Sequence, residues 1–206
     1  MADYKDYGYQ NNDKTHAFGY LQQPLLNLLG KPDQRYILDL GCGNGYLVNL
    51  LVDRGYNAYG TDASEKGIAI AKQTNPDRFF VQDLSTDRLP EELQGIKFDT
   101  IISTEVIEHL YNPEAFIEFC KKALNGKGQL IISTPYHGYL KNLVLSLTNK
   151  WDAHLGPQWL GGHIKFWSRA TLSKLLTDAG FTVTGFKGCG RIPYLWMSMI
   201  IKAEIS

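Results

Sequence analysis

Short apolar runs alternate with amphipathic segments along most of the chain from residue 35 onward. Five of these runs have the length and composition of strands, and they lie at residues 35–41, 57–63, 78–84, 98–104 and 128–134. Apolar residues recur at helical spacing between them, over residues 46–55, 64–73 and 113–124. Strands that alternate with helices of this length predict an α/β fold with a mostly parallel sheet covered on both faces.

Further elements are predicted before and after these alternating strands and helices. Residues 1–15 are polar and rich in tyrosine, and leucines at helical spacing then predict a helix that stops at Gly30. We therefore expect an N-terminal arm and cap helix over 1–34, followed by one domain over 35–206. The last part of that domain is predicted to hold one helix and two strands, over residues 168–180, 181–186 and 196–204.

Residues 136–167 interrupt the alternation of strands and helices. A connection between a strand and a helix usually has about 2–6 residues, and longer insertions are often lids or binding loops. This segment holds three of the four tryptophans and three of the five histidines. Its apolar residues recur at helical spacing: Tyr139, Leu140, Leu143, Val144, Leu147 and Trp151. Such a stripe indicates either core packing or a lid over a flat or lipophilic ligand.

Composition narrows the class of protein. The chain of 206 residues has 21 Lys+Arg and 21 Asp+Glu, so no excess of positive charge is present to hold a nucleic acid or an anionic membrane. No apolar stretch reaches 18 residues, so we expect no stable membrane insertion. Three cysteines without a CxxC pair predict reduced thiols and a cytoplasmic location.

A glycine-rich loop, Asp39-Leu40-Gly41-Cys42-Gly43-Asn44-Gly45, follows the first predicted strand and precedes an amphipathic helix. Ligands of doubly wound sheets bind at the carboxyl ends of the strands. Alternating glycines let the backbone approach a ligand closely and turn into a helix whose N-terminal amides point at it. Asp62 ends the second predicted strand, where a carboxylate can accept hydrogen bonds from both hydroxyls of a ribose.

Two nucleotide cofactors fit such a loop. A nicotinamide dinucleotide requires GxGxxG, and Tyr46 stands where the third glycine belongs. The acid before the glycines, Asp39, would repel a pyrophosphate but suits a ligand that carries an ammonium and a sulfonium. The loop therefore favours S-adenosylmethionine (SAM).

The run ILDLGCGNGYLVNLL, followed by GTDAS, VQDL, FDTIISTEVIEHL and GQLIISTP at later strand ends, resembles the class I SAM-dependent methyltransferases. The resemblance covers residues 35–206, and its motifs are most similar to the ubiquinone-biosynthesis O-methyltransferases. It implies a doubly wound, Rossmann-like sheet of seven strands with an antiparallel last strand and a lid insertion over 136–167.

The resemblance also implies a cofactor site. The methionine part of SAM is expected at the glycine loop and its surroundings: Asp39, Gly41, Cys42, Gly43, Gly45 and Tyr46. The nucleoside part and the mouth of the site are expected at the following strand ends: Asp62, Ala63, Asp83, Leu84 and Thr104. Asp83 would meet the adenine amino group, although an acid at this position is also typical of a loop cap.

The segment EVIEHL follows the fourth predicted strand directly. In a helical turn, Glu105, Glu108 and His109 share one face, and two carboxylates with an imidazole can bind a hard cation such as Mg²⁺. His163, at the return of the insertion to the sheet, is expected as a further ligand. His137 and His154 are the other candidates.

Two branches of the superfamily bind metal at ExxEH: the ubiquinone-type enzymes and the small-RNA 3′-terminal 2′-O-methyltransferases. The segment that begins at His163 resembles the later histidine of the RNA branch. Without a metal, His109 or His163 would serve as general base beside Glu108. We expect a methyltransferase that modifies an oxygen of a small aromatic or lipophilic acceptor, as a monomer or homodimer, without a nucleic-acid partner. A metal-dependent RNA 2′-O-methyltransferase and a non-catalytic cofactor-binding subunit remain the alternatives.

Overall fold

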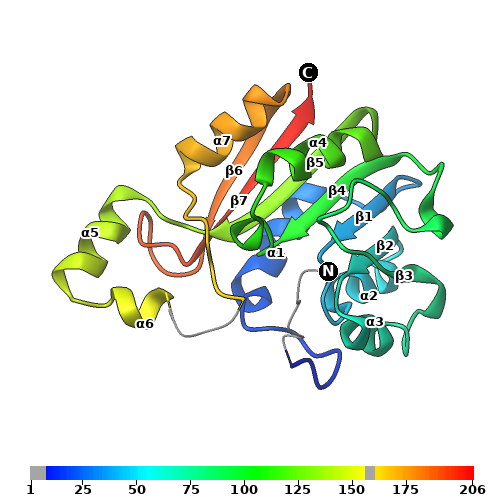
Figure 1. Cartoon of the computed structure of the whole chain (residues 1–206), viewed down its shortest axis with the longest axis horizontal. Helices are drawn as coiled ribbons and strands as arrows, with labels where there is room; N and C mark the ends of the chain where they lie inside the picture. Colours follow the sequence, from blue (N-terminus) through cyan, green and yellow to red (C-terminus); the bar gives the residue numbers. More distant parts are fainter. Residues whose placement is uncertain (1–7, 156–160) are drawn as a thin grey trace.

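The computed structural model describes residues 8–155 and 161–206, so residues 1–7 of the predicted arm and 156–160 of the predicted lid lie outside it. Seven strands form one sheet in the order β3-β2-β1-β4-β5-β7-β6 (Figure 1). The strands are β1 (Tyr36–Leu40), β2 (Asn57–Asp62), β3 (Phe79–Val81), β4 (Phe98–Thr104), β5 (Leu124–Pro135), β6 (Phe181–Cys189) and β7 (Ser198–Ile205). Strands β1 to β5 are parallel, whereas β7 runs antiparallel to both β5 and β6. The predicted fold class is confirmed.

Helices cover both faces of the sheet. The α-helices are α1 (Phe18–Leu29), α2 (Tyr46–Asp53), α3 (Glu65–Ala71), α4 (Pro113–Ala123), α5 (Tyr139–Leu147), α6 (Trp151–Leu155) and α7 (Arg169–Asp178). Three short 3-10 helices are η1 (Pro76–Arg78), η2 (Glu91–Leu93) and η3 (Ile107–His109). No helix in the described part of the chain is long and apolar enough to cross a membrane.

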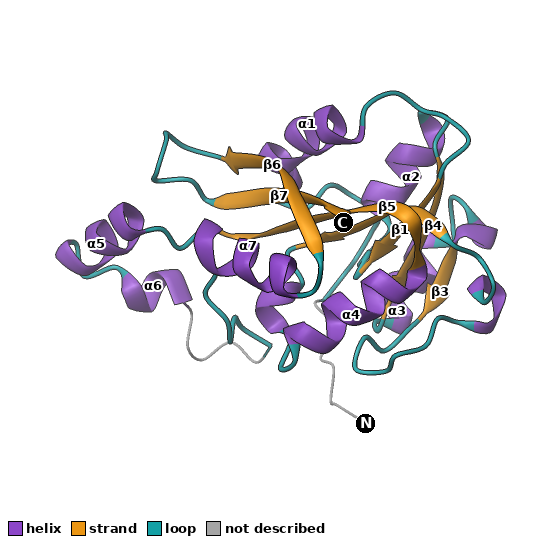
Figure 2. Cartoon of the chain, turned by 90° about the horizontal axis from the view of Figure 1, so that it is seen from above, coloured by secondary structure: helices purple, strands orange, loops and turns teal. Residues whose placement is uncertain are grey.

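Two buried apolar clusters hold these layers together. One cluster joins α1, α2 and α3 to one face of the sheet, and the other joins α4 and α7 to the opposite face. Figure 2 shows α1 and α2 on one side of the strands and α4 and α7 on the other. All three cysteines are buried free thiols, as the spacing predicts.

Local signals in the sequence set the helix ends. Helix α4 begins where the Asn112 side chain accepts a hydrogen bond from the Ala115 amide, with Pro113 as the first helical residue. Helix α7 begins with a reciprocal capping box between Ser168 and Thr171. Because these caps are local, the sequence alone predicts where both helices start.

The reversed direction of β7 decides which loops meet at the site. Ser198, the first residue of β7, pairs with Pro135, the last residue of β5. The loop between β6 and β7 therefore lies at the same edge of the sheet as the carboxyl ends of the parallel strands. Since β7 lies between β5 and β6, its apolar sequence reflects an interior strand.

Helices α5 and α6 extend beyond the sheet (Figures 1 and 2). The apolar stripe of α5 faces solvent, with Tyr139 83% and Leu147 77% exposed. Only Lys141 of this helix is buried. Core packing is therefore the wrong interpretation of the stripe, because the helix lies outside the layers that form the core.

Two leucine substitutions, one in the core and one in α5, test whether α5 lies outside the core. Leu25→Ala in α1 removes a fully buried side chain, and we expect it to lower the free energy of unfolding by about 2–5 kcal/mol. Leu140→Ala in α5, where the side chain is partly exposed, is expected to cost less than about 1 kcal/mol. Urea unfolding of both variants measures the difference. Equal losses would contradict the placement of α5 outside the core.

Candidate active site

The glycine loop between β1 and α2 turns tightly against the end of β2. Its three glycines have positive φ angles of 80°, 56° and 78°, a region that side chains disfavour. The amides of Gly41 and Cys42 both donate to the Thr61 carbonyl, at 2.8 and 2.9 Å. A Cβ atom at Gly41 would collide with Val106, and one at Gly45 with Ala71. The loop therefore has its glycines where the backbone conformation and close packing require them.

Asp62 connects this loop to the end of β2. One carboxylate oxygen accepts the Gly43 amide and the other accepts the Ser64 amide, both at 2.8 Å. A carboxylate offers about four lone-pair positions, so the same oxygens can accept further donors such as ribose hydroxyls. Ala63 lies between Asp62 and Ser64 in this turn.

The end of β3 lies beside the end of β2, because the Gln82 amide donates to the Asp62 carbonyl at 2.9 Å. Asp83 follows directly, and its carboxylate accepts the Ser85 amide at 2.8 Å. This hydrogen bond is the loop cap that the sequence left as the alternative role of Asp83. Leu84 packs partly against the core.

Asp39 is the buried acid before the glycines, and one of its oxygens has no hydrogen-bond partner among the described residues. Burial, together with the nearby charge of Asp62, raises the pKa of Asp39 from 3.8 to about 8. An unpartnered buried carboxyl is costly on its own and favours a cationic ligand beside it. The residues of this loop therefore fit a cofactor that carries an ammonium group.

Tyr46 was expected to contact the cofactor, and its side chain points elsewhere. Its hydroxyl donates to the Gln22 side chain in α1 at 2.7 Å, and its ring packs against Phe18. The side chain thus fastens α2 to α1. Only the backbone of Tyr46 remains at the loop, where its amide donates to the Asn44 side chain.

The N-terminal arm lies over the glycine loop. The Asn44 side chain donates to the carbonyls of Asn11 and Asp13, both at 2.9 Å. The Tyr9 hydroxyl lies so close to Gly43 that a Cβ atom there would collide with it. The sequence predicts an N-terminal arm, but not its attachment to Asn44, which depends on contacts across more than thirty residues.

Glu105 departs from its predicted role. It has a positive φ of 56° and precedes the 3-10 helix η3, so it does not share a helical face with Glu108 and His109. Its two oxygens instead accept the hydroxyls of Ser133 and Ser198, at 2.8 and 3.0 Å. The expectation that Glu105 converges with the other ligands is therefore wrong, because side chains from β5 and β7 hold it away.

Three of the four predicted ligands do come together. Glu108, His109 and His163 each offer a ligand atom, and these atoms lie within 4.8 Å of one another. The second oxygen of Glu108 accepts the Thr134 hydroxyl at 3.0 Å. A cluster of this size can surround one ion.

Backbone hydrogen bonds bring His163 to this cluster from the far end of the insertion. The amides of Ile164 and Lys165 both donate to the Glu108 carbonyl, at 2.9 and 3.0 Å. Nδ1 of His109 contacts the Gly162 carbonyl at 3.3 Å. Because a carbonyl can only accept, that bond places the proton on Nδ1 and leaves the Nε2 lone pair, on the side of Glu108, available to a metal.

The environment favours neutral groups in this cluster. Burial, and then the charge of Glu105, raises the pKa of Glu108. Burial lowers the pKa of His109, and burial with the neighbouring His109 charge lowers the pKa of His163 to about 4. Both imidazoles are therefore unprotonated at neutral pH, which is the form that binds a metal.

The other two candidate ligands lie apart, in an aromatic cluster to which α6 contributes His154 and Trp151. The rings of His137 and His154 have centroids 5.3 Å apart, and His137 also packs against Phe166 at 5.1 Å. Trp151 stacks on His137, with ring centroids 6.4 Å apart. No described residue from this cluster joins Glu108 in the group of ligand atoms.

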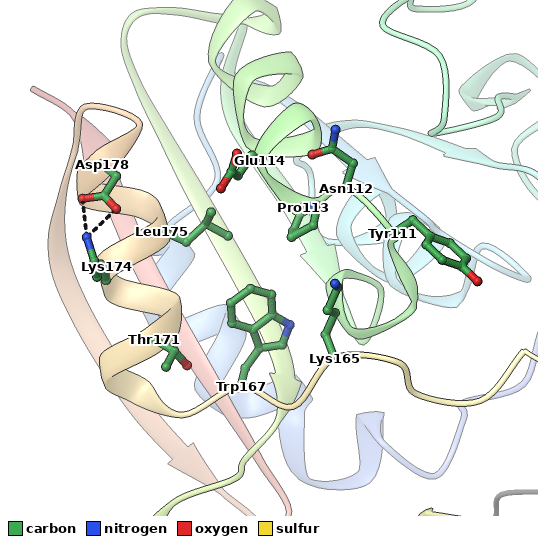
Figure 3. Close-up of a pocket in the computed structure, with 10 residues that line it drawn as sticks. All are labelled: Tyr111, Asn112, Pro113, Glu114, Lys165, Trp167, Thr171, Lys174, Leu175 and Asp178. Carbon is green, nitrogen blue, oxygen red and sulfur yellow. Dashed lines mark hydrogen bonds and ion pairs between the residues drawn. The ribbon is translucent and has the colours of Figure 1, made fainter.

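A surface pocket of about 480 Å³ lies between the start of α4 and the side of α7 (Figure 3). Trp167 lies in it, and the Lys174–Asp178 ion pair lies at its edge. None of the residues that line it belongs to the predicted site, and it is wide open to solvent. Buried titratable groups, such as Asp39 and Glu108, lie instead at or just after the strand ends.

This sheet order, with a glycine loop after β1 and an acid at the end of β2, defines the class I SAM-dependent methyltransferase fold. A family model described as a methyltransferase domain matches residues 14–185. The chain therefore belongs to the family of SAM-dependent methyltransferase domains, as the sequence predicts.

Curated relatives share part of this chain. Ubiquinone biosynthesis O-methyltransferase of Dechloromonas aromatica (strain RCB) is 34% identical over 101 residues, which are 48% of this chain and 43% of that protein. The protein of the same name from Pseudomonas aeruginosa (strain UCBPP-PA14) is 26% identical over 155 residues, which are 74% of this chain and 66% of that protein. The chain thus spans less than two thirds of the length of either relative.

Solved structures share the fold. Magnesium protoporphyrin IX methyltransferase from Synechocystis PCC 6803 with bound SAH is 25% identical, has a TM-score of 0.66, and is matched over 90% of this chain and 80% of that one. The PH0226 protein from Pyrococcus horikoshii OT3 has a TM-score of 0.72 at 18% identity, over 98% of this chain and 100% of that one.

Asp39→Asn tests the role of the buried acid. The folded chain keeps the Asp39 proton up to a pH of about 8, whereas the unfolded chain releases it near 3.8. This group therefore stabilises the fold fully at acid pH, and that contribution is lost as the pH rises from about 4 to about 8. We expect the gain in melting temperature from Asp39→Asn to grow between pH 5 and pH 9, reaching about 4 °C or more.

The same substitution should weaken SAM binding about tenfold or more, because a charge-assisted hydrogen bond is lost. Calorimetric titration measures this effect, and Asp53→Asn, which removes an exposed carboxylate in α2, is the control. Unchanged SAM affinity in Asp39→Asn would show that Asp39 does not face the cofactor.

Proposed function

We propose that this protein transfers the methyl group of SAM to an oxygen of a small aromatic or lipophilic acceptor, with a divalent metal ion at Glu108, His109 and His163. The observation that carries the proposal is the convergence of these three ligand atoms within 4.8 Å, from segments more than fifty residues apart. The names of the ubiquinone biosynthesis relatives support oxygen as the acceptor atom.

The donor set favours a transition metal. Mg²⁺ prefers oxygen ligands throughout, whereas imidazoles suit Zn²⁺, Mn²⁺, Fe²⁺ or Co²⁺. With Glu105 held by two serines, the cluster offers one carboxylate and two imidazoles. The expectation of Mg²⁺ depended on a second carboxylate from Glu105, and we therefore propose a different ion.

Alignment is the main task of the protein in such a transfer. SAM supplies an activated methyl group when bound, so a large part of the rate comes from holding donor and acceptor in line. The glycine loop and Asp62 would fix the donor, and a divalent ion at the cluster would lower the pKa of an acceptor hydroxyl. Thr104, buried at the end of β4, would separate the two halves of the site.

The imidazoles are better suited to ligation than to proton abstraction. A general base works best when its pKa lies near the working pH. The pKa of His163 is lowered to about 4, mainly by burial, which makes this imidazole a weak base at neutral pH. The same shift keeps the ring unprotonated and available to a metal.

The insertion supports a lipophilic acceptor. Exposed aliphatic and aromatic side chains gather on one short helix, α5, beside the site, including Tyr139 and Leu147. Grouped exposed apolar residues are typical of interaction sites. An acceptor with an apolar tail would extend along this helix while its oxygen reaches the cluster.

An RNA 2′-O-methyltransferase is the second candidate, because His163 joins Glu108 and His109. The net charge of zero argues against it, since a protein that follows a phosphate backbone usually carries a basic surface. A non-catalytic cofactor-binding subunit, the third candidate, would have no need of a built cluster of metal ligands.

His163→Ala tests the proposed function. After chelation, the wild-type protein should bind one Mn²⁺ or Zn²⁺ per chain, and added metal should restore methylation of catechol. We expect His163→Ala to lose metal affinity about tenfold or more and activity about 100-fold, equal to about 3 kcal/mol. Calorimetry measures the binding, and release of S-adenosylhomocysteine measures the activity.

His16→Ala is the matched control, because His16 is an exposed histidine distant in sequence from the cluster, and it should retain both properties. Methylation that persists after chelation and in His163→Ala would exclude the metal. Methylation of a short RNA 3′ end, with catechol inert, would establish the second candidate. Tight SAM binding without turnover on any acceptor would establish the third.

A further inference from the structure

We propose that Lys141, together with Arg191, forms an oxyanion-binding site for the methyl acceptor, so that the acceptor carries a phenolate or carboxylate oxygen. This inference rests on the proposed function and adds the charge of the acceptor to it. Neither residue belongs to the glycine loop or to the proposed metal cluster.

Lys141 has an unusual position for a lysine. It is 4% exposed and is the only buried residue of α5, while the apolar residues around it in the sequence face solvent. Lysine is almost never fully buried unless its charge is paired. The inward direction of this one side chain on an exposed helix indicates a function inside the site.

The ammonium of Lys141 lacks a close anionic partner. Its one hydrogen bond among the described residues goes to the Met197 carbonyl, at 3.3 Å. No carboxylate of the described part of the chain lies within ion-pair distance of it. An ammonium offers three donors, so a buried one with a single long bond can accept an anionic oxygen as a further partner.

The charges around Lys141 favour an anion. Burial, followed by the positive charge of Arg191, lowers the pKa of Lys141 to about 8, and the charge of Glu105 opposes this shift. Glu105 is already engaged by the hydroxyls of Ser133 and Ser198. Two positive charges, on α5 and on the β6–β7 loop, therefore act on each other, and the carboxylate that opposes them already accepts two hydroxyls.

Lys141 also lies among the histidines of the insertion. Its charge lowers the pKa values of His137, His154 and His163, in each case after the larger effect of burial. The charge of Lys141 therefore acts on histidines of both the proposed metal cluster and the aromatic cluster that includes α6. An acceptor bound at the metal ligands would be exposed to the same positive charge.

Unpartnered polar atoms gather in the same region. Among the described residues, buried atoms without a hydrogen-bond partner include both ring nitrogens of His137 and Nε2 of His154. His137 is itself only 6% exposed. Buried polar atoms that are left unpaired destabilise the fold. Their concentration here indicates a site shaped for a polar ligand.

Backbone strain marks the second cation. Arg191 has a positive φ of 57°, which is uncommon for a residue with a side chain. Such conformations cluster at functional sites, where the surrounding structure imposes them. The charge of Arg191 also lowers the pKa of His154, after the larger effects of burial and of the Lys141 charge.

Three probes test this proposal: benzoate, 3,4-dihydroxybenzoate and catechol. Their binding is measured in the presence of S-adenosylhomocysteine, which has no methyl group to transfer, so that no turnover occurs. We expect Lys141→Met to weaken binding of 3,4-dihydroxybenzoate at least tenfold, and Lys141→Arg to stay within threefold of the wild type. Lys150→Met, which removes an exposed lysine next to α5, should bind all probes normally. S-adenosylhomocysteine affinity should change less than twofold throughout.

The probes distinguish the source of the oxyanion. If the acceptor presents a carboxylate, Lys141→Met weakens benzoate and 3,4-dihydroxybenzoate but not catechol. If it presents the phenolate that is to be methylated, catechol binding weakens as well, and the phenolate absorbance of bound catechol is lost. Binding of every probe within twofold of the wild type in Lys141→Met would overturn the proposal.

Arg191→Gln provides a second variant at an exposed position, in case Lys141→Met does not fold. A threefold or larger loss of 3,4-dihydroxybenzoate binding is expected, and unchanged binding would overturn the proposal. Benzoate has no hydroxyl to methylate, so its binding is independent of the proposed function. If benzoate binding requires Lys141 but catechol is not methylated, the anion site is supported and catechol is excluded as an acceptor. A wild-type protein that binds none of the probes would overturn the anion site.

Discussion

The carboxylate of Glu105 joins three strands at the edge where the site lies. Hydroxyls from β5 and β7 hold its two oxygens, and its amide donates to the Ser133 carbonyl. The Tyr20 hydroxyl of α1 extends this network through Ser198. At Glu105 the backbone turns through a left-handed conformation, with a φ of 56°. The following 3-10 helix then presents Glu108 and His109 to the segment that returns from the insertion.

The hydrogen-bonded Glu105 lies between two halves of the site. On one side lie β1, β2 and β3, with the glycine loop, Asp39 and Asp62, which fit the nucleoside and methionine parts of a cofactor. On the other side lie β4, β5 and β7, with the metal-ligand cluster and Lys141. The cofactor half depends on backbone geometry, whereas the acceptor half depends on buried titratable side chains whose pKa values are shifted by burial and mutual charge.

Sequence patterns predict the first half well and the second half only in part. The glycine loop and the helix caps follow from local chemistry, the seven-stranded sheet with its antiparallel last strand follows from the resemblance to a known family, and the structure agrees with them. The role of Glu105 does not follow, because a helical turn was assumed where hydroxyls from Ser133 and Ser198 impose another conformation. The periodicity of α5 is visible in the sequence, but the outward direction of its apolar stripe depends on how far the helix extends beyond the sheet. The side chain of Tyr46 is likewise drawn to α1 by Gln22, a partner that no motif specifies.

The antiparallel direction of β7 has a consequence for how such a fold diversifies. The two segments beside the acceptor half, residues 136–167 and the β6–β7 loop, are both anchored on strands whose register is fixed deep in the sheet. Either segment can lengthen or change composition without shifting β1, β2 or the glycine loop. Both segments could therefore be replaced together, on an unchanged cofactor half, to change the acceptor of an engineered enzyme. Natural sequences can diverge in the same two segments.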